Sequence, residues 1–532
     1  MKDEKPESSG ETKRHLVRAA GLLGVMTLTS RALGMVRDVV SAKQYGTSWQ
    51  WDAFVYAFML PNFFRRIIGE GALSSAFIPV YSEESSRGGR EQAFRFANVT
   101  ACVLAVGLAG FILIAEIVFH WLLAAWSLNP RVRLTVELLR FMFPYLWFMS
   151  LYALTMGILN CHKNFFSPAL APIILDVIWI GGIFIVPAMS PVIRTQLQWL
   201  CLIILFSGFV QVAVQIPEVL RLGMRFRWIW DTGDKALRKT FHLLLPSIFN
   251  FAIVQMNLLL DTTLAFLVGP GANSALWYGN RLMQFPLGMF AITMGTALLP
   301  TISSQAAQKD LAAVKKSISF AMRSVFFIIL PSTVGLIALA LPITRMLFER
   351  GEFDAASTVR TAAVVVCYSI GLFAYSGQKI MANGFYAFQE TRTPVKIGAV
   401  ALATNAVLNL ILMWPMKEAG LALATSIAGI LQLALLFLFF RKRMPDFPFG
   451  EIFYSFGKIL VASLAMGGVC LAAFGAMERL CPGQTTAALL VQVGAAMAVS
   501  AAAYVLFCYF FRVQELREAA AWIIARRRQK PA

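Results

Sequence analysis

The chain has 532 residues, of which 58% are hydrophobic and only 14% are charged. Soluble domains carry roughly 25% charged residues, so this composition excludes a soluble multidomain enzyme. The 47 lysines and arginines outnumber the 28 acids and give a formal net charge of +19. Such an excess in a soluble protein would indicate nucleic-acid binding, but the cytoplasmic loops of membrane proteins also concentrate basic residues.

The N-terminal residues 1–15 are polar and mixed in charge, and the first apolar run after them has no small-residue cleavage site. We therefore expect a retained tail rather than a signal peptide. The seven cysteines are scattered, without CxxC or Cys/His ligand spacing, and are expected to be small apolar core residues.

Long apolar runs fill most of the remaining chain. A membrane-spanning helix needs about 20 mostly apolar residues, whereas strands of a membrane barrel are about ten residues of alternating polarity. The runs are long and uniformly apolar, which predicts an all-α integral membrane protein. Fourteen transmembrane helices are expected, near residues 16–43, 50–68, 92–125, 133–160, 168–188, 196–222, 238–268, 273–301, 312–344, 356–388, 394–415, 418–441, 452–476 and 484–511.

The distribution of basic residues predicts the orientation. An even number of spans places both termini on one side of the membrane. The tails and loops of that side hold roughly 33 lysines and arginines against about 10 on the other. We expect a multi-pass protein of the bacterial cytoplasmic (inner) membrane with both termini in the cytoplasm, and the count accounts for most of the charge without nucleic acid.

Two segments of the chain resemble each other six spans apart. Leu60-Pro61 leads to a small-residue segment at 71–82 that contains Pro79, and Phe285-Pro286 leads to a similar segment at 295–304. Repeats of this kind are typical of transporters. The predicted organisation is a cytoplasmic tail (1–15), a six-helix lobe (16–222), a pseudo-symmetric second lobe (223–443) around a central cavity, and two extra helices with a basic cytoplasmic tail (444–532).

Few charged residues lie within the predicted spans. Each of these residues needs a structural or functional explanation, because a charge at the bilayer centre costs about 2.5–3.5 kcal/mol on insertion scales. Those assigned to the membrane interior are the basic residues Arg31, Arg37, Arg65, Arg66, Arg281 and Lys379 and the acids Asp38, Glu116, Asp176 and Asp261. The roles of Lys379, Glu116 and Asp176 stay open at this point.

Four arginines stand in equivalent places of the two halves: Arg31, Arg37, Arg65 and Arg281. They outnumber the neighbouring acids, and guanidinium groups facing a cavity suit phosphate, because their planar fork donates paired hydrogen bonds. We predict that they bind an anion that carries phosphates. The alternative is structural, with Arg37 paired to Asp38 or to an acid of a neighbouring helix.

A second polar group comprises Asp261, Asn405, Asn409 and Thr425. Hard cations take oxygen ligands, so these residues form a candidate site for sodium or proton coupling. The alternative is plain hydrogen bonding between helices, which is common in bundles. No Walker-type phosphate loop is present, so no ATP site is expected and the energy source would be an ion gradient, the membrane potential or the substrate gradient.

No catalytic residues, resident cofactor or firm metal site are expected. Among the histidines, His120 has an acid, Glu116, at helical spacing, but two groups are too few for a metal. A hydrogen bond between these two side chains is the favoured interpretation.

Several motifs resemble the MurJ/MviN family, the bacterial lipid II flippases of the multidrug/oligosaccharidyl-lipid/polysaccharide exporter superfamily. They are Ser30-Arg-Ala-Leu-Gly-Met-Val-Arg-Asp38, Leu60-Pro-Asn-Phe-Phe-Arg-Arg66, Gly69-Glu-Gly-Ala-Leu-Ser-Ser-Ala-Phe-Ile-Pro79 and Asn280-Arg-Leu-Met-Gln-Phe-Pro286. The likeness runs from about residue 16 to the twelfth span and is weaker beyond.

The resemblance implies a non-enzymatic transporter that moves the undecaprenyl-pyrophosphate-linked peptidoglycan precursor from the cytoplasmic to the periplasmic leaflet by alternating access. It places the family's functional residues on Arg31, Arg37, Asp38, Arg65 and Arg281, and implies a groove from the last two helices for the lipid tail. Lipid II and membrane lipids are the expected partners, with the cell-wall synthesis machinery a further candidate and a monomer the expected functional state.

The chain departs from the family at a few positions. Relatives can carry acids flanking the arginine of span 8, where this chain has Asn280 and Gln284, and a lysine where it has Met59. The residues alone leave open a flippase for another lipid-linked polysaccharide precursor. A multidrug cation antiporter of the same superfamily is disfavoured, because it should carry acids rather than arginines in its cavity.

Overall fold

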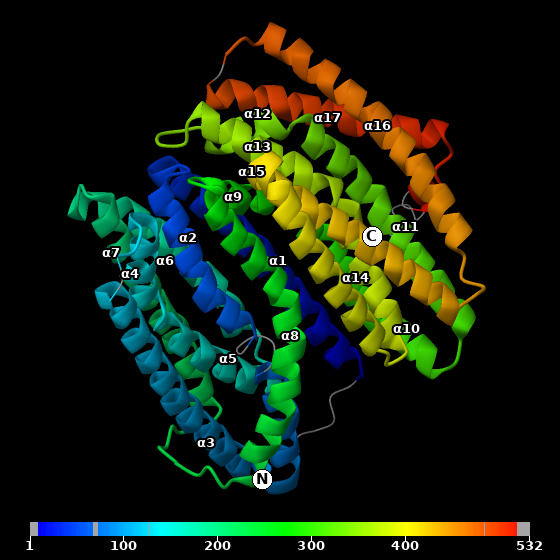
Figure 1. Ribbon diagram of the computed structural model, residues 1–532. Coiled ribbons are helices and arrows are strands. Elements are labelled where there is room, and N and C mark those ends of the chain that lie inside the picture. The colour runs from blue at the N-terminus through cyan, green and yellow to red at the C-terminus, as the bar shows by residue number, and fades with distance from the viewer. Residues whose placement is uncertain (1–8, 68–72, 126, 484, 519–532) are drawn as a thin grey trace. The chain divides into compact units, whose positions relative to one another are not determined.

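The structure is a computed structural model that describes residues 9–67, 73–125, 127–483 and 485–518. All regular structure in these ranges is helical (Figure 1). The expected all-α class is therefore confirmed. The chain divides into two compact units, residues 1–259 and 260–532, and the boundary lies within one helix.

The first unit contains seven whole helices and the beginning of an eighth, which continues into the second unit. They are α1 (Ser9–Tyr45), α2 (Trp49–Phe64), α3 (Ser74–Ala125), α4 (Pro130–Met142), α5 (Tyr145–Cys161), α6 (Phe166–Met189), α7 (Ile193–Arg221) and α8 (Lys235–Val268).

The second unit contains the end of α8 and all later helices. These are α9 (Ala272–Pro286), the π-helix η2 (Leu287–Ala291), α10 (Ile292–Ala307), α11 (Leu311–Ala338), α12 (Ala340–Phe348), α13 (Ala355–Ile370), α14 (Leu372–Ala387), α15 (Arg392–Arg443), α16 (Phe449–Leu480) and α17 (Thr486–Phe510).

The unit boundary differs from the predicted lobe boundary at residue 222 because α8 serves both units. Near its start, Lys239 forms an ion pair with Glu83 of α3. Near its end, Asp261 contacts α15. The last two helices, α16 and α17, pack against each other and α16 packs on α11, so they belong to the second unit (Figure 1).

Nine helices of the described chain are long and apolar enough to cross a membrane, or ten if the bent pair α4 and α5 forms one span. Each of the fourteen predicted spans falls on one helix or on consecutive helical elements. The difference in number has four sources: α1 carries several charges, α2 has only 16 residues, α8 contributes only the shorter apolar helix Gln255–Val268 among the described residues, and α15 carries two predicted spans. The number of membrane crossings stays a prediction.

Two long helices contain sharp breaks. In α3 the break is at Gly89, whose φ of 74° lies in the left-handed region that glycine tolerates. In α15 it is at Lys417, with φ 52°, two residues after Pro415. Proline removes a backbone donor and crowds the preceding turn, which explains why the predicted spans 394–415 and 418–441 are separated here.

The internal repeat has a structural counterpart. Pro61 lies inside α2 and is followed by a π-helical turn at residues 65–67. Pro286 ends α9 and is followed by η2. A wide π turn accommodates an extra residue in a helix, and such turns are frequent at functional positions. Both copies of the repeat therefore carry the same helix irregularity.

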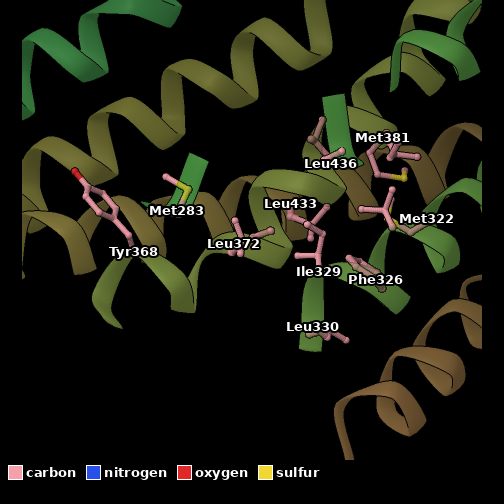
Figure 2. Close-up of a cluster of buried hydrophobic side chains, with 14 of the residues drawn as sticks. Met283, Met322, Phe326, Ile329, Leu330, Tyr368, Leu372, Met381, Leu433 and Leu436 are labelled. Carbon is pink, nitrogen blue, oxygen red and sulfur yellow. The ribbon is translucent and has the colours of Figure 1, made fainter. Parts of the chain in front are cut away.

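The core of the second unit is built from branched, sulfur-containing and aromatic side chains. Met322, Phe326 and Ile329 of α11 gather with Leu433 and Leu436 of α15, and all are buried (Figure 2). Lipid tails are as apolar as leucine, so close packing rather than exclusion of water stabilises such contacts within a membrane.

Gly420 follows the break in α15 and offers a test of this packing. A Cβ added there would overlap the backbone oxygen of Leu412. We expect Gly420→Ala to destabilise the protein by about 1–3 kcal/mol, because backbone atoms must move. The thermal unfolding midpoint of the purified protein in detergent should fall.

Gly457 in α16 is the matched control, because a Cβ there would meet nothing within 4 Å. Gly457→Ala should leave the midpoint unchanged or raise it, since alanine favours helix. Equal midpoints for the two variants would contradict the close backbone approach at Gly420.

Candidate functional site

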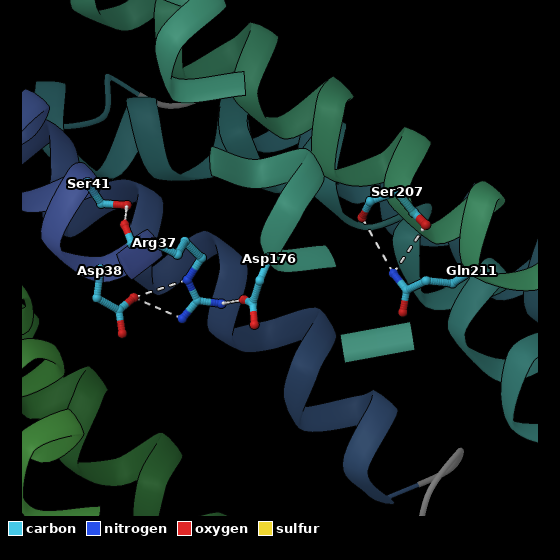
Figure 3. A network of polar contacts seen from close by, with 6 residues as sticks. All are labelled: Arg37, Asp38, Ser41, Asp176, Ser207 and Gln211. Atoms are coloured by element: carbon cyan, nitrogen blue, oxygen red, sulfur yellow. Dashed lines mark hydrogen bonds and ion pairs between the residues drawn. The ribbon is translucent and has the colours of Figure 1, made fainter. Parts of the chain in front are cut away.

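Arg37 of α1 lies between two carboxylates. Its Nε and Nη2 donate hydrogen bonds to Asp38 Oδ1 at 3.1 and 2.8 Å, and its Nη1 donates to Asp176 Oδ1 of α6 at 2.9 Å (Figure 3). The three residues are only 5%, 1% and 5% exposed. The guanidinium therefore ties α1 to α6.

An aromatic ring covers the same guanidinium. Trp179 lies one helical turn after Asp176, and its ring centre is 4.7 Å from Arg37 Cζ. This indole in turn packs edge-on against Phe54 and Phe58 of α2, with ring centres 5.5 and 4.8 Å apart. A cation over an indole face gains about 0.5–2 kcal/mol depending on its exposure to solvent. The cluster thus links α1, α2 and α6.

The pairing of Arg37 follows the structural alternative rather than the uncompensated cation expected from the sequence. One guanidinium therefore contacts two buried carboxylates, one on its own helix and one on α6. The reason is Asp176, which stands out in the sequence as an acid in an apolar span. Its helix face, and hence its partner, becomes evident only once α1 and α6 pack together.

The other arginines of the first unit are more accessible. Arg31 is half-buried on α1, two turns before the carboxylate cluster. Arg65 lies in the π-helical turn after α2, half-buried, with its Nε donating to Asn62 Oδ1 at 3.0 Å. Next to it, Arg66 is exposed and reaches Gln255 Oε1 of α8 at 3.5 Å.

Arg281 of the second unit is half-buried on α9, and its Cζ lies 5.8 Å from the ring centre of Trp277. The amides at the two flanking positions, Asn280 and Gln284, form a hydrogen bond with each other. They stand where relatives can carry an acidic pair, so neither flanking position supplies Arg281 with a carboxylate.

The polar group predicted in the second half does assemble. Asp261 of α8 accepts hydrogen bonds at Oδ1 from the Nδ2 atoms of Asn405 and Asn409, at 2.8 and 2.7 Å, and at Oδ2 from Thr425 Oγ1 at 2.9 Å. Asp261 is 7% exposed and both asparagines are fully buried. Three residues from two predicted spans therefore surround the carboxylate of Asp261.

The donor set suits a hard cation. A carboxylate and a hydroxyl oxygen are present, and the buried Oδ1 of Asn409 has no hydrogen-bond partner among the described residues. A half-turn of an asparagine amide exchanges its oxygen and nitrogen, so both amides can present oxygen towards Asp261 instead of N–H. Within the described residues, no group of three or more His, Cys, Asp or Glu side chains could hold a metal ion.

The remaining charged residues within the spans take other places. Glu116 accepts a hydrogen bond from Arg140 Nε at 3.0 Å, which differs from the expected bond with His120. The reason is that Arg140 of α4 reaches across to α3 with a charged donor. Lys379 is exposed on α14.

Comparison with known proteins finds strong matches. The family model for "Lipid II flippase MurJ" matches residues 41–513. A "Probable lipid II flippase MurJ" of Vibrio cholerae is 33% identical over 80% of this chain and 82% of its own. A "Lipid II flippase MurJ" of Burkholderia cenocepacia is 32% identical over 86% of this chain and 89% of its own.

Solved structures agree with the sequence relatives. A lipid II flippase MurJ in an inward closed conformation superposes with a TM-score of 0.77 at 27% identity and covers 92% of this chain and 99% of that one. An inward-facing multidrug resistance MATE transporter superposes with a TM-score of 0.67 over 78% of this chain and 95% of that one. At 13% identity, the second likeness shows the fold alone.

The carboxylate cluster around Arg37 makes a prediction for stability. Arg37→Ala removes a cation that contacts two buried carboxylates, and breaking a buried ion pair in this way costs about 3–5 kcal/mol. We expect a large fall in the thermal midpoint of the purified protein. Adding Asp176→Asn should recover part of the loss, because the buried carboxylate that faced Arg37 is then replaced by a neutral amide.

A double-mutant cycle over Arg37 and Asp176 measures this coupling directly. The exposed pair of Arg221 and Glu218 is the control cycle, since it should give a coupling near zero. Additive effects of Arg37→Ala and Asp176→Asn would contradict the buried pairing.

Proposed function

The chain belongs to the lipid II flippase MurJ family, and from this membership we propose that it moves the undecaprenyl-pyrophosphate-linked peptidoglycan precursor from the cytoplasmic to the periplasmic leaflet by alternating access. The observation that carries the proposal is the family match over residues 41–513. The proposed activity is transport rather than catalysis. The excess of basic residues on the side of the termini supports a cytoplasmic-membrane protein with both termini in the cytoplasm.

We propose that Arg31, Arg65 and Arg281 make the first contacts with the pyrophosphate. All three are half-buried, so their guanidinium groups can be reached without dismantling a core. Guanidinium forks bind phosphate oxygens in pairs and keep their charge at any physiological pH. Lipid II is the substrate proposed for these groups.

Arg37 would take part in a different way. In this conformation Asp38 and Asp176 occupy three of its five N–H donors. A pyrophosphate must compete with these carboxylates for the guanidinium, so substrate binding and release from Asp176 would be linked. A ligand that prefers the released state shifts the population towards it by its difference in affinity.

The lipid tail has a candidate groove in the second unit. A cavity of about 430 Å³ lies between α11, α14, α15 and α16, and aromatic and aliphatic side chains line it, with Arg441 at its edge. The resemblance implied a groove from the last two helices. Here α16 contributes residues to the lining and α17 does not.

We further propose that Asp261 and its partners bind the coupling ion, sodium or a proton. The converging oxygens of Asp261, Thr425 and the two turned asparagine amides suit sodium, whereas protonation would neutralise the same carboxylate. Either event changes the charge of one buried group on α8 and α15. The membrane potential is a further candidate for the driving force.

A rival function is the transfer of another lipid-linked polysaccharide precursor, which would use the same phosphate chemistry. The MATE-type structures share the fold, and the arginines argue against a cation substrate. A monomeric working state and contact with the cell-wall synthesis machinery are further expectations for this chain.

Arg281→Ala tests the arginine assignment in cells depleted of their own lipid II flippase. Removal of one charge-assisted phosphate contact, worth about 1.5–3 kcal/mol, should slow transfer roughly 10–100-fold. We expect loss of growth support and accumulation of lipid II in the inner leaflet, with normal amounts of protein in the membrane. Arg65→Ala should act in the same direction.

Arg221→Ala is the matched control, because this arginine is 74% exposed and pairs only with Glu218 among the described residues. It should support growth fully. Full growth with Arg281→Ala would overturn the assignment of that arginine, while loss of growth with Arg221→Ala would show that the assay reports general damage.

The ion proposal predicts that Asp261→Asn lowers transfer and abolishes its dependence on sodium or on external pH. Thr425→Val removes one oxygen and keeps the side-chain shape, so it should raise the sodium concentration needed for half-maximal transfer. Transfer of lipid II into the outer leaflet of vesicles containing the purified protein measures both effects. Transfer that ignores sodium and pH in the unchanged protein would exclude coupling at Asp261.

A further inference from the structure

A pocket of about 450 Å³ opens at one end of the first unit, where three helices begin. It lies among the first residues of α2, α4 and α7. Its lining includes Trp49, Leu128, Arg133, Glu137, Val192 and Arg194. None of these residues belongs to the arginine or Asp261 sites described above.

The charges in the pocket do not cancel. Arg194 donates two hydrogen bonds to Glu137, from Nε to Oε2 at 2.8 Å and from Nη2 to Oε1 at 2.5 Å. Arg133 reaches the same carboxylate only at 3.4 Å. Within the described part of the chain, neither arginine forms an ion pair with another acid. Two cations therefore share one anion, and one positive charge is left for a ligand.

The helix starts add to this positive field. Each helix N-terminus carries a partial positive charge from its unsatisfied N–H groups. Side chains cap α2 and α4, where Ser48 and Asn129 accept from the second or third helical N–H. At α7 the N-cap is Val192, which offers no side-chain hydrogen bond. The dipoles of three helices thus favour an anion at the place where the guanidinium groups converge.

The pocket is amphipathic rather than uniformly polar. Arg133 and Arg194 are 59% and 55% exposed, so they can turn towards a ligand without unfolding their helices. Beside them Val192 is 55% exposed, and Trp49 is half-buried. Tryptophan next to arginine at the ends of apolar helices is typical of the level of lipid headgroups.

The expected position of Arg133 and Arg194 relative to the membrane is unusual for basic residues. In the orientation proposed above, this end of the unit is periplasmic, where basic residues are scarce. Arg131, close by, is matched by the buried Asp52 at 2.9 Å, and Arg140 by Glu116 at 3.0 Å. Arg133 and Arg194, in contrast, share the single carboxylate of Glu137.

From these observations we propose that the pocket binds the phosphate of an anionic phospholipid from the periplasmic leaflet. The guanidinium of Arg133 and the free edge of Arg194 receive the phosphate oxygens, and Trp49 and Val192 contact the glycerol and the first carbons of the acyl chains. Only the choice of leaflet depends on the proposed function. The bound lipid would hold the starts of α2, α4 and α7 together.

Lipid titration of the purified full-length protein in detergent tests the proposal, with native mass spectrometry as the readout. Phosphatidylglycerol should bind more tightly than phosphatidylcholine of the same chain length. Arg133→Gln should raise the dissociation constant for phosphatidylglycerol about tenfold, because one charge-assisted contact is lost. Arg133→Lys keeps the charge and should recover part of the binding.

Arg87→Gln is the matched control. Like Arg133, Arg87 is exposed, pairs with a glutamate four residues away, and shares that glutamate, Glu83, with a second cation, Lys239. It lies on α3, away from this pocket, and its removal should leave phosphatidylglycerol binding unchanged. Thermal midpoints without lipid verify that each variant is folded.

Three results would overturn the proposal: equal weakening by Arg133→Gln and Arg87→Gln, equal binding of phosphatidylcholine, or displacement of phosphatidylglycerol by inorganic phosphate at equal concentration. The last result would identify a soluble anion as the ligand. Binding is measured without transport, so a failure here and a failure of the flippase function are told apart.

Discussion

A buried guanidinium group needs a carboxylate partner, because an unpaired charge removed from water is costly. In the first unit, the guanidinium of Arg37 finds such partners on α1 and α6. Asp38 on its own helix and Asp176 on α6 divide its donors between them. Trp179 covers its face and rests on the aromatic side chains of α2. Loss of one of these residues removes a buried charged contact, and such a loss is strongly destabilising, so the cluster favours one mutual arrangement of α1, α2 and α6.

The second unit contains a buried ionisable group of the opposite charge. Its buried carboxylate, Asp261, is surrounded by neutral donors from two asparagines and a threonine. Hydrogen bonds of this kind reduce the cost of burying a charge but leave its sign uncompensated. The Arg37 cluster instead places a guanidinium against two carboxylates. Each unit therefore buries a carboxylate at a defined contact, one beside a cation and the other among neutral donors.

The sequence predicts the helical class, the position of each span and the repeated Pro segments, because long apolar runs and prolines act locally. It also predicts the partners of Asp261, since Asn405 and Asn409 lie one helical turn apart on one face. It does not predict the partner of Arg37. Asp176 is 139 residues away, and which of the buried faces meet depends on tertiary packing. The pocket at Arg133 was missed for the same reason, because its charged residues lie on helix starts that become neighbours only in the fold.

The π-helical turns after Pro61 and Pro286 have a geometric consequence. A π turn stores one residue more than an α turn, and its conversion to α geometry passes that residue on along the helix. Everything beyond it then rotates by about 100° and advances by about 1.5 Å. In the first unit the stored residue is within the segment that carries Arg65 and Arg66. Each repeat thus contains a π turn whose conversion to α geometry can rotate the following helix face without breaking the helix.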